Sequence, residues 1–175
     1  GMTDAGMTDA GTTDAGTTDG PIVGVNLLWL VPGRVGGSEQ ATMRQLEALA
    51  ELADAPRYRL FCTPALRRAH PEVVGAFDAK ELDVAAHSRT RRILAEATTL
   101  NRAARDADIE LMHHGGGTLP LHSSLPCTVT IHDIQPIDEP GNIAWLRRRY
   151  LARGLPSAAQ RARRIAVPST FVRNR

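Results

Sequence analysis

Histidine, glycine and acidic residues gather at four points of the chain, each directly after an apolar run that is typical of a strand. These points are Gly33–Ser38, His113–Thr118, His132–Asp138 and Ser169–Thr170. A histidine titrates near neutrality and can donate to, or accept from, a substrate hydroxyl, and a neighbouring carboxylate can orient that hydroxyl or tune the histidine. We therefore take His132 and Asp133 as the candidate catalytic pair. The structural alternative is that His132 plugs a strand end and Asp133 caps a turn.

The loop Gly33–Ser38 places three glycines and a serine in front of a helical pattern. Glycines let backbone N–H groups approach a ligand closely, and a helix amino terminus favours an anion or a hydroxyl oxygen. Glu39 would compete with a bound phosphate unless its side chain points away. The alternative is a tight strand-to-helix turn that needs glycine for its geometry. The substrate-binding candidates from this loop are Gly36, Gly37 and Ser38.

The same loop lacks the marks of a nucleotide cofactor site. It has neither the GxGxxG pattern of dinucleotide sites nor the Gly-Lys-Ser/Thr of a phosphate-cradling loop. The second apolar run ends in Phe61-Cys62-Thr63, without the acidic residue that would hold a ribose. We therefore expect no nicotinamide or ATP cofactor.

His113 and His114 stand before three glycines, which invites a metal-site interpretation. Adjacent residues of a strand point to opposite faces of the sheet, so the pair cannot readily chelate one ion, and we expect no metal. One of the two is better suited to line a crevice. Three further histidines are typical of surface or loop positions: His70, His87 and His122. The substrate-binding candidates that complete the set are His114, Gly115, Gly116 and Ser169.

Apolar runs alternate with helical patterns through most of the chain. The predicted strands are Ile22–Leu30, Tyr58–Thr63, Leu82–Ala86, Ile109–His113, Cys127–Ile131 and Arg164–Val167. The predicted helices begin at Ser38 as a cap, near Ser88 or Thr90, near Asn142 and after Pro156, with residues 64–80 helical or irregular. This alternation predicts an α/β fold, namely a Rossmann-like three-layer sandwich around a mostly parallel sheet of about six strands. Ligands of such sheets bind beyond the carboxyl ends of the strands, where the four points meet.

The length of 175 residues fits about one domain. We place that domain at 21–175 and read 1–20, a polar repeat of MTDAG type, as a disordered tail. No apolar run reaches the roughly 20 residues of a membrane helix, and the chain does not begin like a secretory signal. These features predict a cytoplasmic protein with Cys62 and Cys127 as reduced, buried thiols.

The net charge of +2 hides a basic end, because no acidic residue follows Pro140. Arginines fill 147–164, where Ile143, Leu146 and Tyr150 recur at the spacing of a helix core face. We interpret this segment as a packed helix with a solvated arginine face and expect no nucleic-acid partner. Peripheral contact with the inner face of a membrane is the alternative that its charge leaves open.

The strand-end motifs together resemble one known family. Gly36-Gly37-Ser38-Glu39 resembles the GG-x-E turn of retaining, nucleotide-sugar-dependent glycosyltransferases of the GT-B fold (glycosyl transferase group 1, family 4 type). The stretches 108–115, 131–136 and 164–171 are similar to that family's fourth strand with its glycines, its His-Asp motif and its I-x-V-x-S-x-F strand end. The resemblance covers about Ile22 to Arg175, and its strength lies in four motifs in the right order.

The resemblance implies two Rossmann-like domains that face a cleft, of which this chain is the amino-terminal, acceptor-binding one. It implies transfer of a sugar from a nucleotide-sugar co-substrate to a carbohydrate or lipid-linked hydroxyl acceptor, with retention and without an essential metal. By resemblance, Gly36 and Gly37 line the acceptor and phosphate region, His132 contacts the donor sugar or the reacting hydroxyl, and Asp133 supports it. The family's Glu-x7-Glu motif belongs to the carboxy-terminal donor domain, which lies beyond Arg175, so we expect this chain alone to transfer nothing.

Two other functions remain open at this point. One is a stand-alone Rossmann-like binding or regulatory module. The other is an isomerase or phosphorylase that shares the GT-B architecture.

Overall fold

The computed structural model describes residues 20–84, 88–120, 122–132 and 145–174. Strands and helices alternate along these residues, and a single π-helical turn, η1, interrupts the helical segment that follows the third strand. In chain order the elements are β1 (Ile22–Asn26), α1 (Gly37–Ala50), β2 (Arg57–Cys62), α2 (Pro64–Ala69), α3 (Pro71–Gly75), β3 (Asp78–Glu81), α4 (Arg89–Ala95), η1 (Glu96–Leu100), α5 (Asn101–Arg105), β4 (Leu111–His114), β5 (Cys127–Thr130), α7 (Trp145–Arg161), β6 (Arg164–Ala166) and α8 (Thr170–Arg173).

The strands of the described residues form one six-stranded parallel sheet in the order β3-β2-β1-β4-β5-β6. This confirms the predicted α/β class and its Rossmann-like sheet. The chain builds outward from β1 to β3 and then returns to the other side of β1, so the strand order reverses between β1 and β4. In open parallel sheets such a reversal marks the usual ligand position, at the carboxyl ends of the strands.

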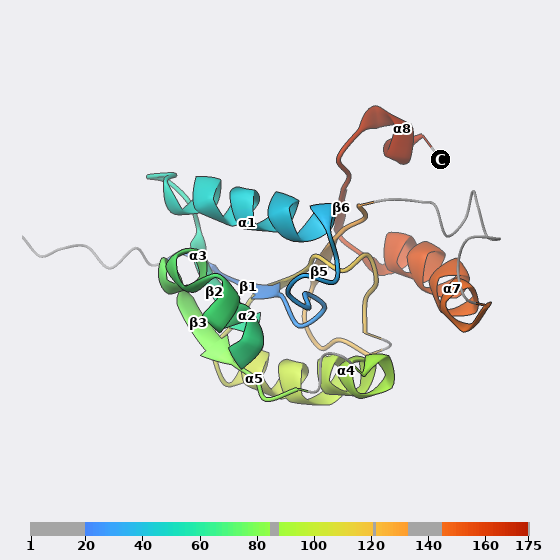
Figure 1. The fold of residues 1–175 in the computed structure, drawn as a ribbon, viewed down its shortest axis with the longest axis horizontal. Coiled ribbons are helices and arrows are strands. Elements are labelled where there is room, and N and C mark those ends of the chain that lie inside the picture. The colour runs from blue at the N-terminus through green and yellow to red at the C-terminus, as the bar shows by residue number, and fades with distance from the viewer. Residues whose placement is uncertain (1–19, 85–87, 121, 133–144, 175) are drawn as a thin grey trace, which may run out of the picture.

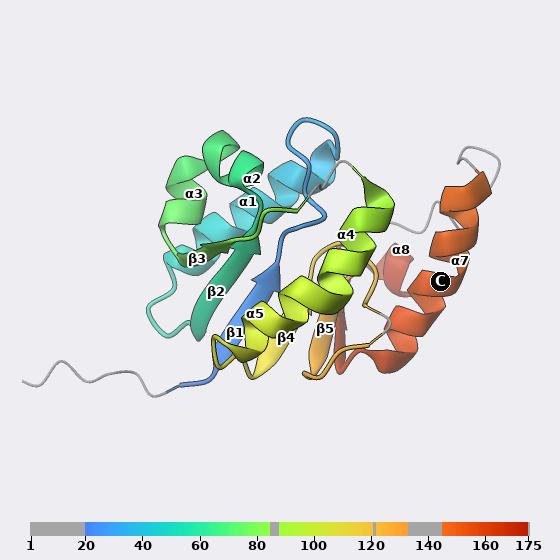
Figure 2. The same cartoon turned by 90° about the horizontal axis from the view of Figure 1, so that it is seen from below.

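Helices cover both faces of the sheet, with α1 on one face and α4 to α5 on the other (Figures 1 and 2). The α1 face carries a core cluster in which Met43 and Leu46 of the helix meet Val25 of β1. A second cluster lies on the opposite face and joins Phe61 and Met112 of the sheet to residues of η1 and α5. On that same face, α7 contributes Leu155 and Ala158 against Val129 of β5.

β1 is shorter than its apolar run predicts. The strand ends at Asn26 rather than Leu30, because the Asn26 side chain accepts a hydrogen bond from the N–H of Leu28 at 3.0 Å and turns the chain. Residues 27–30 are nevertheless buried, so their apolar character reflects the core and not a strand. The strand therefore ends four residues earlier than predicted.

The third strand is Asp78–Glu81 and not Leu82–Ala86 as predicted. β3 lies at the edge of the sheet and is mostly exposed, so polar residues suffice and the apolar signal is absent. Leu82 directly after it is buried, and its N–H donates to the carbonyl of Cys62 at 2.9 Å. The apolar pattern thus marked Leu82, which enters the core just beyond the strand. The end of the predicted strand, residues 85 and 86, lies outside the described part of the chain.

Prolines act differently at the two places where breaks were expected. The segment 64–80 contains two short helices, α2 and α3, each of which begins with a proline at a position where no helical hydrogen bond is lost. The predicted break at Pro156 is wrong, because α7 runs from Trp145 to Arg161 with this proline inside. Pro156 is exposed, so its ring faces away from the core.

Three other predictions from the sequence concern the cysteines, a membrane-spanning helix and the amino-terminal tail. Cys62 and Cys127 are free and buried, as predicted, and burial raises the pKa of the Cys62 thiol to about 11. None of the described helices has the length and apolar character needed to cross a membrane. The predicted disordered tail lies outside the described residues up to position 19.

Candidate functional site

Two of the four strand-end motifs contribute residues to one cavity, which reaches the carboxyl edge of the sheet. The cavity has a volume of about 390 Å³ and runs between α1 and the sheet. Gly115 after β4 and His132 after β5 line it, together with Thr42, one helical turn beyond the glycine loop. Among the described residues, His113, Gly115 and His132 of the predicted motifs line this cavity, and the glycine loop does not.

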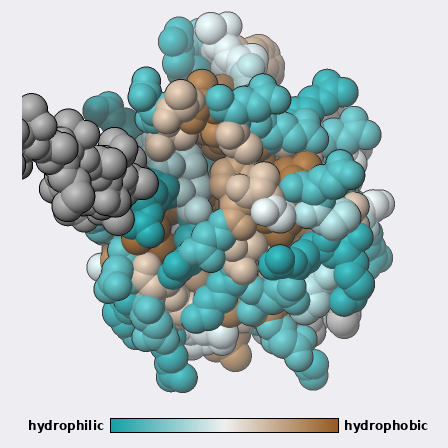
Figure 3. Space-filling view, turned by 90° about the vertical axis from the view of Figure 1, so that its left-hand side faces the viewer, coloured by the Kyte–Doolittle hydropathy of each residue, from teal (hydrophilic) through white to brown (hydrophobic). Residues whose placement is uncertain are grey.

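Most of the cavity wall is apolar. Val23 and Val25 of β1 face Leu46 and Leu49 of α1 across it, and Tyr58 of β2 closes one side. Viewed from the left-hand side of Figure 1, apolar residues reach the surface in patches between hydrophilic ones (Figure 3). A ligand that enters this space would meet hydrocarbon along most of its length and polar groups at the carboxyl edge.

His113 supplies part of the polar floor of the cavity. Its Nδ1 lies 2.8 Å from the hydroxyl of Thr128, and its Nε2 lies 3.1 Å from the hydroxyl of Thr130. Burial, followed by the proximity of His132, lowers the pKa of His113. Both ring nitrogens are engaged by hydroxyls, so a neutral His113 fits the floor as a satisfied polar group.

His114 lies on the opposite face of β4, as the alternation of a strand requires. It is 2% exposed, and its Nδ1 lies 3.1 Å from Asn26 Nδ2. Burial, with smaller effects of His113 and Arg161, lowers the pKa of His114 to about 3. This histidine is therefore neutral at physiological pH. It does not line the cavity, so the substrate-binding role predicted for His114 finds no support from the cavity.

Gly115 and Gly116 support the Trp29 indole. A Cβ on Gly115 would lie 3.0 Å from Trp29 Nε1, and one on Gly116 would lie 2.8 Å from Trp29 Cγ. The indole in turn lies beside His132, with ring centroids 5.5 Å apart. Because these two positions carry no side chain, the Trp29 indole can pack against them. In this position the indole contacts the ring of His132.

Gly116→Ala is expected to destabilise the protein by about 1–3 kcal/mol, the usual cost of overpacking a filled space. The clash falls on Cβ and Cγ of Trp29, which sit close to the backbone and cannot swing aside. Urea unfolding at neutral pH measures the loss. The matched control is Gly75→Ala, where a new Cβ meets no atom within 4 Å. Equal stabilities for the two variants would contradict the packing described here.

The glycine loop turns through Gly36, whose φ of 59° and ψ of −130° suit only glycine. Gly37 is the first residue of α1, and neither glycine has a heavy atom within 4 Å of its Cβ direction, so both backbones are open to a ligand. Ser38 does not cap the helix as predicted, because Gly36 takes the cap position and the helix has already begun. The carbonyl of Ser38 instead accepts a hydrogen bond from the hydroxyl of Thr42 at 2.8 Å.

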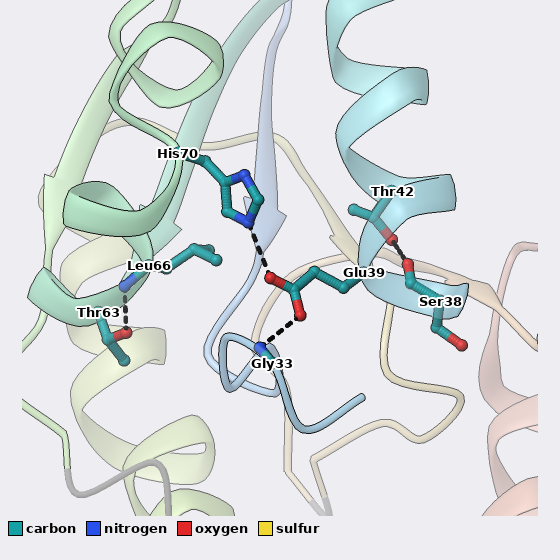
Figure 4. A network of polar contacts seen from close by, with 7 residues as sticks. All are labelled: Gly33, Ser38, Glu39, Thr42, Thr63, Leu66 and His70. Carbon is teal, nitrogen blue, oxygen red and sulfur yellow. Dashed lines mark hydrogen bonds and ion pairs between the residues drawn. The ribbon is translucent and has the colours of Figure 1, made fainter. Parts of the chain in front are cut away.

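Glu39 turns inward from the loop, as Figure 4 shows. Its carboxylate accepts a hydrogen bond from the N–H of Gly33 at 2.8 Å and lies 2.8 Å from His70 Nε2. The hydrogen bond from His70 holds the pKa of Glu39 below its ordinary value, against the opposing effect of burial. The negative charge is thereby engaged within the protein and does not occupy the open side of the Gly36–Gly37 turn.

Glu39→Gln is expected to lower the free energy of unfolding by about 1–2 kcal/mol near neutrality, because a charge-assisted contact is lost. A carboxyl whose folded pKa is depressed stabilises the fold above its ordinary pKa of 4.5, and this contribution disappears as the pH falls through the lower folded value. Urea unfolding at a series of pH values should show the two proteins converging in acid. Glu47→Gln, exposed on the same helix, is the control and should follow the wild type throughout.

Asp133 and Ser169 complete the set of predicted site residues. Asp133 lies outside the described residues. Ser169 is exposed and lies between β6 and α8. Its hydroxyl accepts a hydrogen bond from the N–H of Val172 at 3.3 Å and so caps α8. The catalytic role of the first and the substrate-binding role of the second stay predictions.

Several polar residues of this region carry no signal in the sequence. Asn26 and Glu96 are buried beneath the strand ends, and His70, expected at the surface, is half-buried against Glu39. Their partners are distant in the chain, 88 residues in the case of Asn26 and His114. Only the single polar residue in an apolar run, Asn26, could have drawn attention from sequence alone.

Within the part of the chain that the structure describes, no three histidine, cysteine or carboxylate side chains gather as a metal site would require. Comparison of the chain with protein-family models, with curated proteins and with solved structures gives no significant match.

Proposed function

We propose that this chain is the acceptor-side domain of a glycosyltransferase that moves a sugar from a nucleotide-sugar donor to a hydroxyl acceptor with retention. The observation that supports this function best is that Gly115 and His132 line one cavity, which reaches the carboxyl edge of a parallel sheet. That edge is where open α/β sheets bind their ligands.

The open turn supplies the contacts for the charged part of the substrates. Gly36 and Gly37 present backbone at the amino terminus of α1, which favours a phosphate or a hydroxyl oxygen. The carboxylate of Glu39 is engaged by Gly33 and His70, so it leaves this end of the helix available to an anion. Ser38, in the first turn of α1, extends the same binding edge.

His132 supplies the group nearest to the reaction. It is half-buried, is held beside Trp29 and lines the cavity, so a hydroxyl that enters the cavity meets its ring. In this proposal His132 positions or accepts a proton from the reacting hydroxyl, and Asp133 supports it. The apolar wall of the cavity suits an acceptor that carries a hydrocarbon portion beside its hydroxyl. The donor domain, the nucleotide sugar and the acceptor are the partners that the proposal requires.

The test is product analysis on the full-length protein that contains this domain, incubated with radiolabelled nucleotide sugars and a panel of hydroxyl acceptors. We expect label to move into an acceptor with the anomeric configuration retained. Rearrangement of the nucleotide sugar without an acceptor would favour an isomerase, and phosphate-dependent release of sugar 1-phosphate would favour a phosphorylase. Absence of any turnover, together with ligand binding by this domain alone, would favour a stand-alone binding module.

A further inference from the structure

The cavity between α1 and the sheet changes from apolar to polar along its length. At the end where the strands begin, four apolar side chains that are only half-buried form its wall: Val23, Leu49, Tyr58 and Leu111. Their partial exposure means that this apolar end reaches the protein surface. Toward the carboxyl edge the strands contribute hydroxyls and histidines instead. The wall therefore matches a ligand that carries hydrocarbon at one end and polar atoms at the other.

The polar part of the wall can both donate and accept hydrogen bonds. His113 lies between the hydroxyls of Thr128 and Thr130, at 2.8 Å and 3.1 Å, and all three residues line the cavity. Burial lowers the pKa of His113, so near neutrality its ring is neutral and has one N–H and one acceptor nitrogen. Whichever nitrogen holds the proton, one threonine hydroxyl donates to the ring and keeps its lone pairs, while the other accepts and keeps its hydrogen. A ligand hydroxyl, itself both donor and acceptor, fits this pair of hydroxyls.

The described part of the cavity wall contains no aspartate, glutamate, lysine or arginine. A carboxylate, phosphate or ammonium group inside it would lose its hydration without meeting an opposite charge from these residues, which is costly. We therefore expect the polar end of a ligand to be uncharged. The cavity differs in this respect from the turn at Gly36 and Gly37, which favours an anion and does not line the cavity.

The size of the cavity limits the length of its ligand. Its volume of about 390 Å³ lies within the range of roughly 300–1,000 Å³ that is usual for ligand pockets. From Leu111 to Gly115 the wall follows β4 and its end for about 13 Å, at about 3.3 Å per residue. With C–C bonds of about 1.5 Å and tetrahedral angles, an extended alkyl chain of about ten carbons fills this length.

We propose that this cavity binds an uncharged long-chain alcohol, with its alkyl chain along the apolar wall and its hydroxyl at Thr128 and Thr130. The binding goes beyond the proposed function, because it does not require that a sugar is transferred. The two proposals can therefore fail separately. An alcohol that binds here but never accepts sugar would count against the transfer, and transfer to acceptors without any alcohol binding would count against this inference.

Calorimetric titration of the purified chain with 1-alkanols from hexanol to dodecanol tests the proposal. The titrations are made below the solubility limit of each alcohol and at pH 8, above the ordinary pKa of histidine. We expect affinity to rise about fourfold with each CH₂ and to level off at about ten carbons, beyond which the chain leaves the wall. Decanoate and decylammonium should bind about tenfold more weakly than 1-decanol or worse, because their charges find no partner. Absence of saturable 1-decanol binding, or equal affinity for the three decyl compounds, would overturn the proposal.

Matched variants locate the binding in the cavity. Leu49→Gln places an amide on the apolar wall and should weaken 1-decanol binding by about tenfold. Leu52→Gln makes the same change at a leucine that is 60% exposed and does not line the cavity, so it should bind like the wild type. Val23→Thr keeps the shape of the wall, adds a hydroxyl to it and provides the test if Leu49→Gln does not fold. Wild-type affinity in the folded wall variants would exclude this cavity as the binding site.

Discussion

Acidification from pH 6.5 toward pH 3 is expected to destabilise this protein steeply, because His114 must become protonated when the chain unfolds but not while it is folded. Its folded pKa is lowered from an ordinary value of 6.5 to about 3 by burial. Between these two values the unfolded state binds one more proton than the folded state, so stability falls as the pH falls, by roughly 1.4 kcal/mol per pH unit from this residue alone. The full effect is on the order of a few kcal/mol, a large part of the stability of a small domain.

Other groups modify this slope in known directions. The lowered pKa of His113 acts in the same sense as that of His114. Burial raises the pKa of Glu96, so its contribution is present in acid and is lost as the pH rises, which offsets part of the loss. The measurement is urea unfolding between pH 4 and pH 7 of the wild type and of His114→Gln, in which the titrating ring is gone. His122→Gln, at an exposed position, is the control. Identical pH slopes for all three proteins would contradict the assignment.

If the proposed sugar transfer takes place, we expect His132→Ala to lower its turnover by about 10²- to 10⁴-fold, the range typical of a lost general acid or base. The loss of stability should be small in comparison, because the ring is half-buried and lines a cavity instead of filling the core. The experiment compares kcat and KM for sugar transfer with the free energy of unfolding of the same preparations. His122→Ala is the matched control, since it removes an exposed ring. Unchanged turnover in His132→Ala would remove this residue from the reaction.

The fold followed from the sequence where strands are buried on both faces. β1, β4 and β5 are buried strands in the middle of the sheet, and each was visible as an apolar run. β3 was misplaced because an edge strand needs little burial, so the apolar signal marked Leu82, which enters the core behind it. The early end of β1 depended on a side-chain hydrogen bond of Asn26, which periodicity does not reveal.

The site was predictable where it depends on strand ends and not where it depends on distant partners. The rule that ligands bind at carboxyl ends placed Gly115 and His132 together without any contact information, whereas the glycine turn does not line their cavity. The same rule said nothing of Glu96, which reaches Asn26 from a helix on the far face of the sheet. It also could not show that Gly116 accommodates Trp29, because that need arises only when residues far apart in sequence pack together.

β6 ends the sheet within the described residues, and all three of its residues are exposed, with Ile165 at 43%. Its backbone pairs with β5 on one side, and no described strand pairs with it on the other. Such a border is a template onto which another extended chain can add. At high protein concentration we therefore expect strand-on-strand association through this border, with Ile165 as its apolar contact.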